Sequence, residues 1–237
     1  MKNTWIIFKR EIASYFVSPT AYIIGAAFLV LAGLFFVLPY FFGSREATLR
    51  NWMSTLTVLL LFIAPMLTMR LLAEEKQSGT IELLLTSPVR DWEVVLGKFC
   101  AALGLWLAIL FVTLAYPLVL KLFGDPDFIP IATGYLALIL VGGAMLAVGV
   151  LSSALGPNQI VAVIVGFAIL LVLWVASALQ NVFPGAVGSI FAYLSLTDHM
   201  NDLMKGVVDS KDIIYYVSVI VGCLFVSTRL IEARRWS

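Results

Sequence analysis

Long apolar runs separated by short polar segments dominate the chain. A bilayer core about 30 Å thick is crossed by about 20 apolar helical residues. Runs without charge lie at 21–42, 51–69, 99–120, 131–155 and 160–179, with a shorter run at 213–228. The turn Gly156-Pro157-Asn158-Gln159 separates the fourth run from the fifth. This pattern predicts an all-α polytopic membrane protein with six transmembrane helices, folded as a single domain over residues 1–237.

Residues 3–17 precede the first run and show helical periodicity. Their apolar face carries Trp5, Phe8, Ile12, Tyr15 and Phe16. We expect an amphipathic helix lying in the membrane interface, and the alternative is an extension of the first span. The apolar run that follows is too long for a signal peptide, so no cleaved leader is expected.

The amino-acid composition is typical of a membrane protein, and the net charge excludes one class of partner. Hydrophobic residues make up 62% and charged residues 12%, against about 45–50% and about 25% in soluble domains. The net charge of +1 argues against a nucleic-acid partner. The two cysteines lie in apolar runs, so we expect no disulfide framework. Lys and Arg are more frequent in the segments on the same side as both termini, which predicts that both termini are cytoplasmic.

The predicted spans contain no Asp, Glu, Lys, Arg or His. A proton relay or a voltage sensor needs such residues within the membrane. The chain also lacks a phosphate-binding loop, a zinc-binding His pair and a nucleophilic serine motif. We therefore expect a subunit that is not itself an enzyme and that receives energy from a partner.

The fourth span is rich in small residues, which allow helix backbones to approach closely. Packing within the chain and a dimer face are both compatible with this spacing. Hydroxyl residues such as Thr113 and Ser153 are expected to donate packing hydrogen bonds, and Pro65 and Pro117 are expected to kink their helices. The small residues are Gly142, Gly143, Ala147 and Gly149.

The segment 70–98, between the second and third spans, is the most informative part of the sequence. The second span is predicted to continue as a helix through Glu74, Glu75 and Lys76 and to end at Gly79. Glycine commonly ends helices because it adopts positive φ without strain. The prediction is a helix that projects out of the membrane.

A second short helix is predicted to follow directly. Thr80 can cap its N-terminus, and Glu82 falls in its first turn. Ser87-Pro88 offers a further helix start, with proline in the first helical position. A stiff helix at this position could transmit a movement of a soluble partner to the transmembrane helices. The alternative is an amphipathic loop lying on lipid.

Residues 73–88, followed by Gly97-Lys98, resemble the signature loop of type-2 ABC transporter permeases. Segments 8–11, 194–215 and 232–236 add a resemblance to the bacterial gliding-motility-type branch. The resemblance implies a six-helix permease half in the bacterial inner membrane. Its partners would be a second permease half, identical or different, and two copies of a soluble ATPase that binds ATP and Mg²⁺, so no cofactor is expected on this chain.

The same resemblance implies roles for individual segments. The loop after the second span would contain the coupling helix that docks into the ATPase, and residues 3–17 would form an interfacial connecting helix. The residues to which we assign docking are Glu74, Glu75, Gly79, Thr80, Glu82 and Arg90.

Residues 180–211 are too apolar for a simple solvated loop. The resemblance implies short helices that re-enter the outer leaflet and gate the exit. The gate residues would be Pro184, Asp198, His199 and Gly206. Asp198, His199 and Asp202 form too small a ligand set for a convincing metal site, so no metal is expected.

The sequence thus predicts the permease subunit of an ATP-driven transporter, expected to be an exporter. One alternative is a membrane scaffold that transmits ATPase motion to periplasmic machinery, such as that of gliding motility, and moves no solute. A second is a membrane-embedded metalloenzyme built on Asp198, His199 and Asp202.

Overall fold

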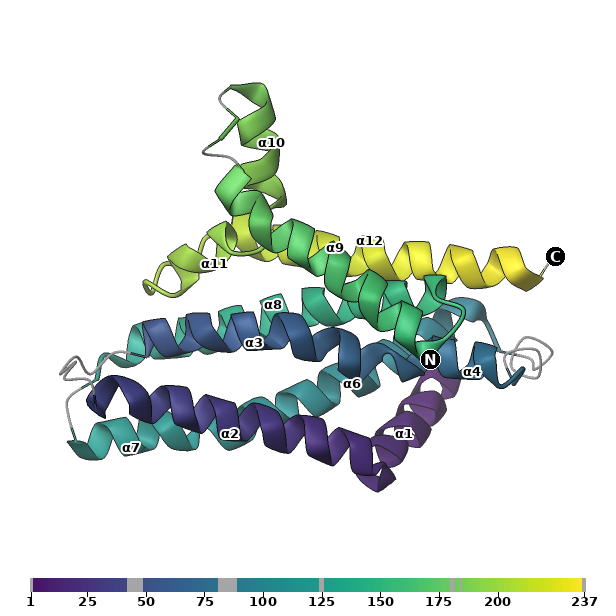
Figure 1. Ribbon diagram of the computed structural model, residues 1–237, viewed down its shortest axis with the longest axis horizontal. Helices are drawn as coiled ribbons and strands as arrows, with labels where there is room; N and C mark the ends of the chain where they lie inside the picture. The colour runs from purple at the N-terminus through teal and green to yellow at the C-terminus, as the bar shows by residue number, and fades with distance from the viewer. Residues whose placement is uncertain are drawn as a thin grey trace.

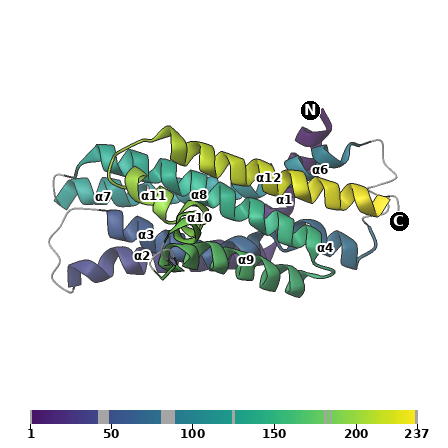
Figure 2. The ribbon, with the colours of Figure 1, turned by 90° about the horizontal axis from the view of Figure 1, so that it is seen from above.

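The computed structural model describes residues 2–41, 49–80, 89–123, 126–179, 182–183 and 185–235, and these contain helices and no strand. The helices are α1 (Lys2–Val17), α2 (Pro19–Phe41), α3 (Arg50–Thr68), α4 (Arg70–Gln77), α6 (Asp91–Thr113), α7 (Ala115–Phe123), α8 (Phe128–Leu155), α9 (Gln159–Leu179), α10 (Ala186–Leu194), α11 (Asp198–Leu203) and α12 (Ser210–Arg235) (Figure 1). Both ends of the chain lie at the end of the bundle that carries α4 (Figures 1 and 2).

Within the described residues, six helical segments are long and apolar enough to cross a membrane. They are α2, α3 with α4, α6 with α7, α8, α9 and α12. The prediction of six spans in an all-helical membrane protein is confirmed. The helices extend beyond the charge-free runs because polar residues at their ends, such as Glu75 and Asp91, are also helical.

Helix α8 forms the centre of the bundle. It packs against α3, α12, α9 and α6, and 78% of its most apolar window is buried. By contrast, α9 and α12 expose large apolar side chains such as Ile160 and Phe225. In a membrane protein such surfaces suit contact with lipid or with another membrane helix.

The small residues of α8 lie inside the chain and allow its neighbours to approach. A Cβ on Gly142 would lie 2.1 Å from Nε1 of Trp106, and one on Gly149 would lie 2.1 Å from Oγ1 of Thr68. The other members of the predicted set, Gly143 and Ala147, are also buried. Of the two uses considered for these positions, the structure shows packing within one chain, because none of them reaches the surface.

The two prolines predicted to kink their helices, Pro65 and Pro117, have different effects. Pro117 has no N–H to donate to the carbonyl of Thr113, and α6 ends at Thr113. The freed carbonyl instead accepts a hydrogen bond of 2.9 Å from the hydroxyl of Tyr135. Helix α3 continues through Pro65 to Thr68, so its interruption falls at Met69, one turn after the proline.

Helix α1 is a helix as predicted, and its buried face matches the predicted apolar face only in part. Phe8 and Ile12 of that face lie close to Gly104 of α6. Ile7 is buried against α6, whose Gly97 lies close to it, while Trp5 and Phe16 are exposed. The predicted face assumes contact with lipid alone, whereas α1 also packs along α6. Its location in the membrane interface remains a prediction, and the exposed Trp5 and Phe16 suit it.

Candidate functional site

Helix α4 ends where the sequence predicts. Its last residue is Gln77, and Gly79 adopts a positive φ of 71°. The N–H of Ser78 donates to the carbonyl of Glu74 at 2.9 Å, which satisfies one of the last carbonyls of the helix. The hydroxyl of Thr80 lies 2.8 Å from that of Ser78, so it points back toward α4.

Glu82 and Ser87-Pro88 lie outside the described residues, and the short helix expected there remains a prediction. Residues 89 and 90 are not helical, and α6 begins at Asp91. Helix α6 therefore begins before the charge-free run at 99–120 that predicts the third span. The start is set at Arg90, whose N–H donates to the carboxylate of Glu93 at 3.3 Å.

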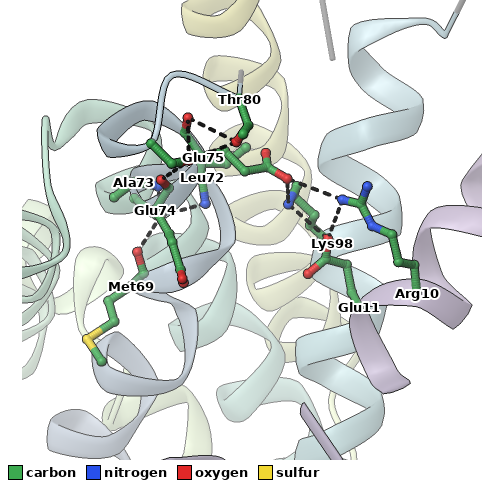
Figure 3. A network of polar contacts seen from close by, with 11 residues as sticks. Arg10, Glu11, Met69, Leu72, Ala73, Glu74, Glu75, Thr80 and Lys98 are labelled. Carbon is green, nitrogen blue, oxygen red and sulfur yellow. Dashed lines mark hydrogen bonds and ion pairs between the residues drawn. The ribbon is translucent and has the colours of Figure 1, made fainter. Parts of the chain in front are cut away.

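Four charged residues meet where α4 passes α1 and α6, and we call them the ion cluster: Arg10, Glu11, Glu75 and Lys98 (Figure 3). The ammonium of Lys98 lies 2.8 Å from Oε1 of Glu75 and 3.1 Å from Oε1 of Glu11. Nη2 of Arg10 lies 2.9 Å from Glu11 and 3.2 Å from Glu75. The cluster therefore joins α1, α4 and α6, which are distant in the sequence.

Burial gives the ion cluster its energetic importance. The side chain of Lys98 is only 2% exposed, and a buried charge needs close partners to offset lost hydration. Burial alone would raise the pKa of Glu11, but the charges and hydrogen bonds of Lys98 and Arg10 outweigh it and lower this pKa. The hydrogen bond from Arg10 to Glu11 also raises the pKa of the Arg10 guanidinium. Glu11 and Arg10 are therefore both charged at neutral pH.

The ion cluster changes the interpretation of the predicted docking residues. Glu75 is 17% exposed and bonded to Lys98, so it links helices instead of presenting a free carboxylate. Glu74, Gly79, Thr80 and Arg90 are exposed and remain available to a partner. Glu74 and Thr80 also line a cleft of about 410 Å³ between α1 and α4.

Helix α4 is also bonded to the end of α8. The hydroxyl of Ser153 accepts hydrogen bonds of 3.0 Å from the N–H groups of Leu72 and Ala73. Lys76 donates to the carbonyls of Ala154 and Gly156 at the C-terminal end of α8, where a cation is favoured by the helix dipole. Helix α4 is thus held by polar contacts on α1, α6 and α8.

Sequence reasoning did not find the ion cluster or the target of Ser153. The available signal was the presence of Glu11, Glu75 and Lys98 next to predicted spans on the same side of the membrane. That signal places three charges in one layer without showing that their helices are neighbours.

At the opposite side of the bundle, the structure locates the predicted gate residues except Pro184, which lies outside the described residues. Nδ1 of His199 lies 2.8 Å from Oδ1 of the buried Asp212, and Nε2 lies 3.2 Å from the carbonyl of Tyr193. His199 therefore ties α11 to both α10 and α12. Helix α10 stands out from the side of the bundle (Figure 1), and its re-entry into a bilayer remains a prediction.

The other gate residues have local roles. The N–H of Asp198 donates to the hydroxyl of Ser195 at 3.2 Å, and Gly206 adopts a φ of 90° just after α11. Asp202 pairs with Lys205 at 3.2 Å and not with His199. In the part of the chain that the structure describes, no three His, Cys, Asp or Glu side chains are grouped as metal ligands would be.

The fold and the polar contacts around α4 define a multi-span membrane protein with a helix projecting from one end and bonded to three others. The family model described as ABC-2 family transporter protein matches residues 5–227. The chain therefore belongs to the ABC-2 transporter family, and the resemblance to type-2 ABC permeases is confirmed at the level of the family. A comparison with curated proteins finds no match.

Proposed function

We propose that the chain is the permease subunit of an ATP-driven exporter and that its ATPase docks at the end of α4. The observation that carries the proposal is the set of polar contacts that hold α4. This helix leaves the membrane-spanning α3 and is bonded to α1 and α6 through the ion cluster and to α8 through Ser153. A displacement of α4 would therefore reach three other helices without passing through a flexible segment.

The rest of the complex follows from family membership and from charge. The proposed partners are two copies of a soluble ATPase, which would hold ATP and Mg²⁺, and a second permease half. The α4 end would face the cytoplasm of a bacterial cell together with both termini, because Lys and Arg are more frequent on that side. Export and the gliding-motility-type branch are supported by the resemblance of residues 73–88, 194–215 and 232–236.

Purification of the tagged full-length chain from its native membrane in a mild detergent tests this proposal. We expect a soluble ATPase to co-purify at close to one copy per permease, and a heterodimer would add a second permease chain. Glu74→Lys, an exposed change on α4, should weaken retention of the ATPase. Lys121→Glu, an exposed change on α7 at the opposite end, should not.

A permease that emerges alone and stable, with and without nucleotide, would contradict the proposal. Co-purification of the ATPase together with proteins from outside the membrane would favour the scaffold alternative. Equal retention in the two variants would place the docking surface elsewhere.

A further inference from the structure

The start of α4 lacks a cap from its own chain segment. The first N–H groups of a helix have no partner within the helix, and a side-chain oxygen of the preceding residue usually accepts from them. The residue in that position is Met69, which makes no side-chain cap. The N–H groups of Leu72 and Ala73 donate instead to the hydroxyl of Ser153 on α8, each at 3.0 Å.

The hydroxyl of Ser153 also donates its own proton to α4's starting turn. Its acceptor is the carbonyl of Met69, at 3.0 Å. The Ser153 side chain of α8 thus bonds to two backbone N–H groups and one backbone carbonyl at the junction between α3 and α4. Ser153, Leu72 and Ala73 are fully buried, so water cannot readily replace these hydrogen bonds.

A second contact holds the other end of α4 to the same helix. Lys76, near the last turn of α4, donates to the carbonyl of Gly156 at 3.3 Å and to that of Ala154. Since α4 is fixed near both of its ends, it cannot tilt or slide on α8 without losing hydrogen bonds. Helix α8 in turn packs against α3, α9 and α12.

We propose that Ser153 is a positioning residue that fixes α4 on α8 and passes movement of α4 to the centre of the bundle. The role rests on the proposed function, because the movement would come from a docked ATPase. The hydroxyl acts through geometry: it supplies the cap that Met69 cannot supply, and it does so from the helix that receives the movement.

The neighbouring Ser152 provides a matched control. It is also buried, but its hydroxyl donates to the carbonyl of Gly149 within α8, at 2.9 Å. Ser152→Ala and Ser153→Ala each remove one buried hydroxyl from adjacent positions of the same helix. Only Ser153→Ala removes hydrogen bonds to α4.

The first measurement is hydrogen exchange of the purified full-length permease in lipid nanodiscs. Loss of a buried hydrogen-bond partner should speed exchange of the amides in residues 70–77 by about tenfold in Ser153→Ala, and Ser152→Ala should leave them unchanged. Ser153→Thr keeps the hydroxyl and should restore the slow exchange. Equal exchange in the two alanine variants would overturn the assignment of Ser153 as the cap.

The second measurement is ATP hydrolysis by the complete complex with its ATPase, compared with hydrolysis by the ATPase alone. Ser153→Ala should reduce the effect of the permease on hydrolysis by about tenfold while the ATPase remains bound. Ser152→Ala should behave as the unmodified complex. This pattern is not expected from a loss of stability alone, because the ATPase remains bound to a folded permease while hydrolysis no longer responds to it.

The results separate this inference from the proposed function. If the ATPase binds and the two alanine variants hydrolyse ATP alike, the positioning role fails and the proposed function stands. If the unmodified permease retains no ATPase, the proposed function fails, and the coupling role of Ser153 fails with it.

Discussion

Replacing Lys98 by methionine should destabilise the protein because it removes the buried cation of the ion cluster. The change keeps an unbranched apolar side chain one atom shorter than lysine but leaves Glu11 and Glu75 facing each other. Their remaining partner is Arg10, whose side chain is 58% exposed and therefore screened by water. Breaking a buried pair by removal of one partner costs about 3–5 kcal/mol. The lower value is appropriate here because both carboxylates are partly exposed, at 15% and 17%.

That cost corresponds to a large shift in thermal unfolding. One kcal/mol lowers the melting temperature of a chain of this size by about 2–4 °C, so Lys98→Met should lower it by about 6–12 °C. The assay is thermal unfolding in detergent, followed by circular dichroism. Lys205→Met is the matched control, because its pair with Asp202 is 53% and 41% exposed and contributes about 1 kcal/mol or less.

A double variant and a pH series make the test specific. Adding Glu75→Gln to Lys98→Met should recover part of the lost stability, because it removes the excess negative charge. The pKa of Glu11 is lowered in the folded protein, so its stabilising contribution is complete above the ordinary carboxyl pKa and is lost as the pH falls through the lowered value. If Lys98→Met melts within about 1 °C of Lys205→Met, the energetic account of the ion cluster is refuted.

Two further changes test the packing of the bundle. Tyr135→Phe removes the hydroxyl that donates to the carbonyl of Thr113. It should lower the free energy of unfolding by about 1–3 kcal/mol, because a buried acceptor is left unpaired. An unchanged melting temperature would show that another donor replaces the hydroxyl. Gly142→Ala places a methyl group against Trp106 and should cost about 1–3 kcal/mol. Gly222→Ala in α12 meets nothing within 4 Å and should stabilise by about 0.5–1 kcal/mol, so similar melting temperatures for these two variants would contradict the packing account.

The spans and the end of α4 could be predicted because their signals lie along the chain. A charge-free run is visible without knowledge of its neighbours, and Gly79 ends a helix through its own backbone freedom. The start of α6 was not predicted, because it lies in the charged segment before the charge-free run at 99–120 and depends on Glu93 reaching back to Arg90.

The contacts that hold α4 depend on which helices are neighbours in the fold. The spacing of residues along the sequence does not predict which helices those are. Glu74 and Glu75 are adjacent residues of the same type, yet successive side chains of a helix point about 100° apart. One is therefore exposed while the other enters the ion cluster. Ser153 fits the general expectation of a packing donor, but its partner is the backbone of a different helix.

The central claim, that the ATPase docks at the α4 end, is tested most directly by site-specific photo-crosslinking in native membranes. A photoreactive amino acid is placed at Thr80, exposed just beyond α4, or at Lys121, exposed on α7 at the opposite end of the bundle (Figure 1). The account predicts a crosslink to the soluble ATPase from position 80 and none from position 121. A crosslink from position 121 but not from position 80 would contradict it.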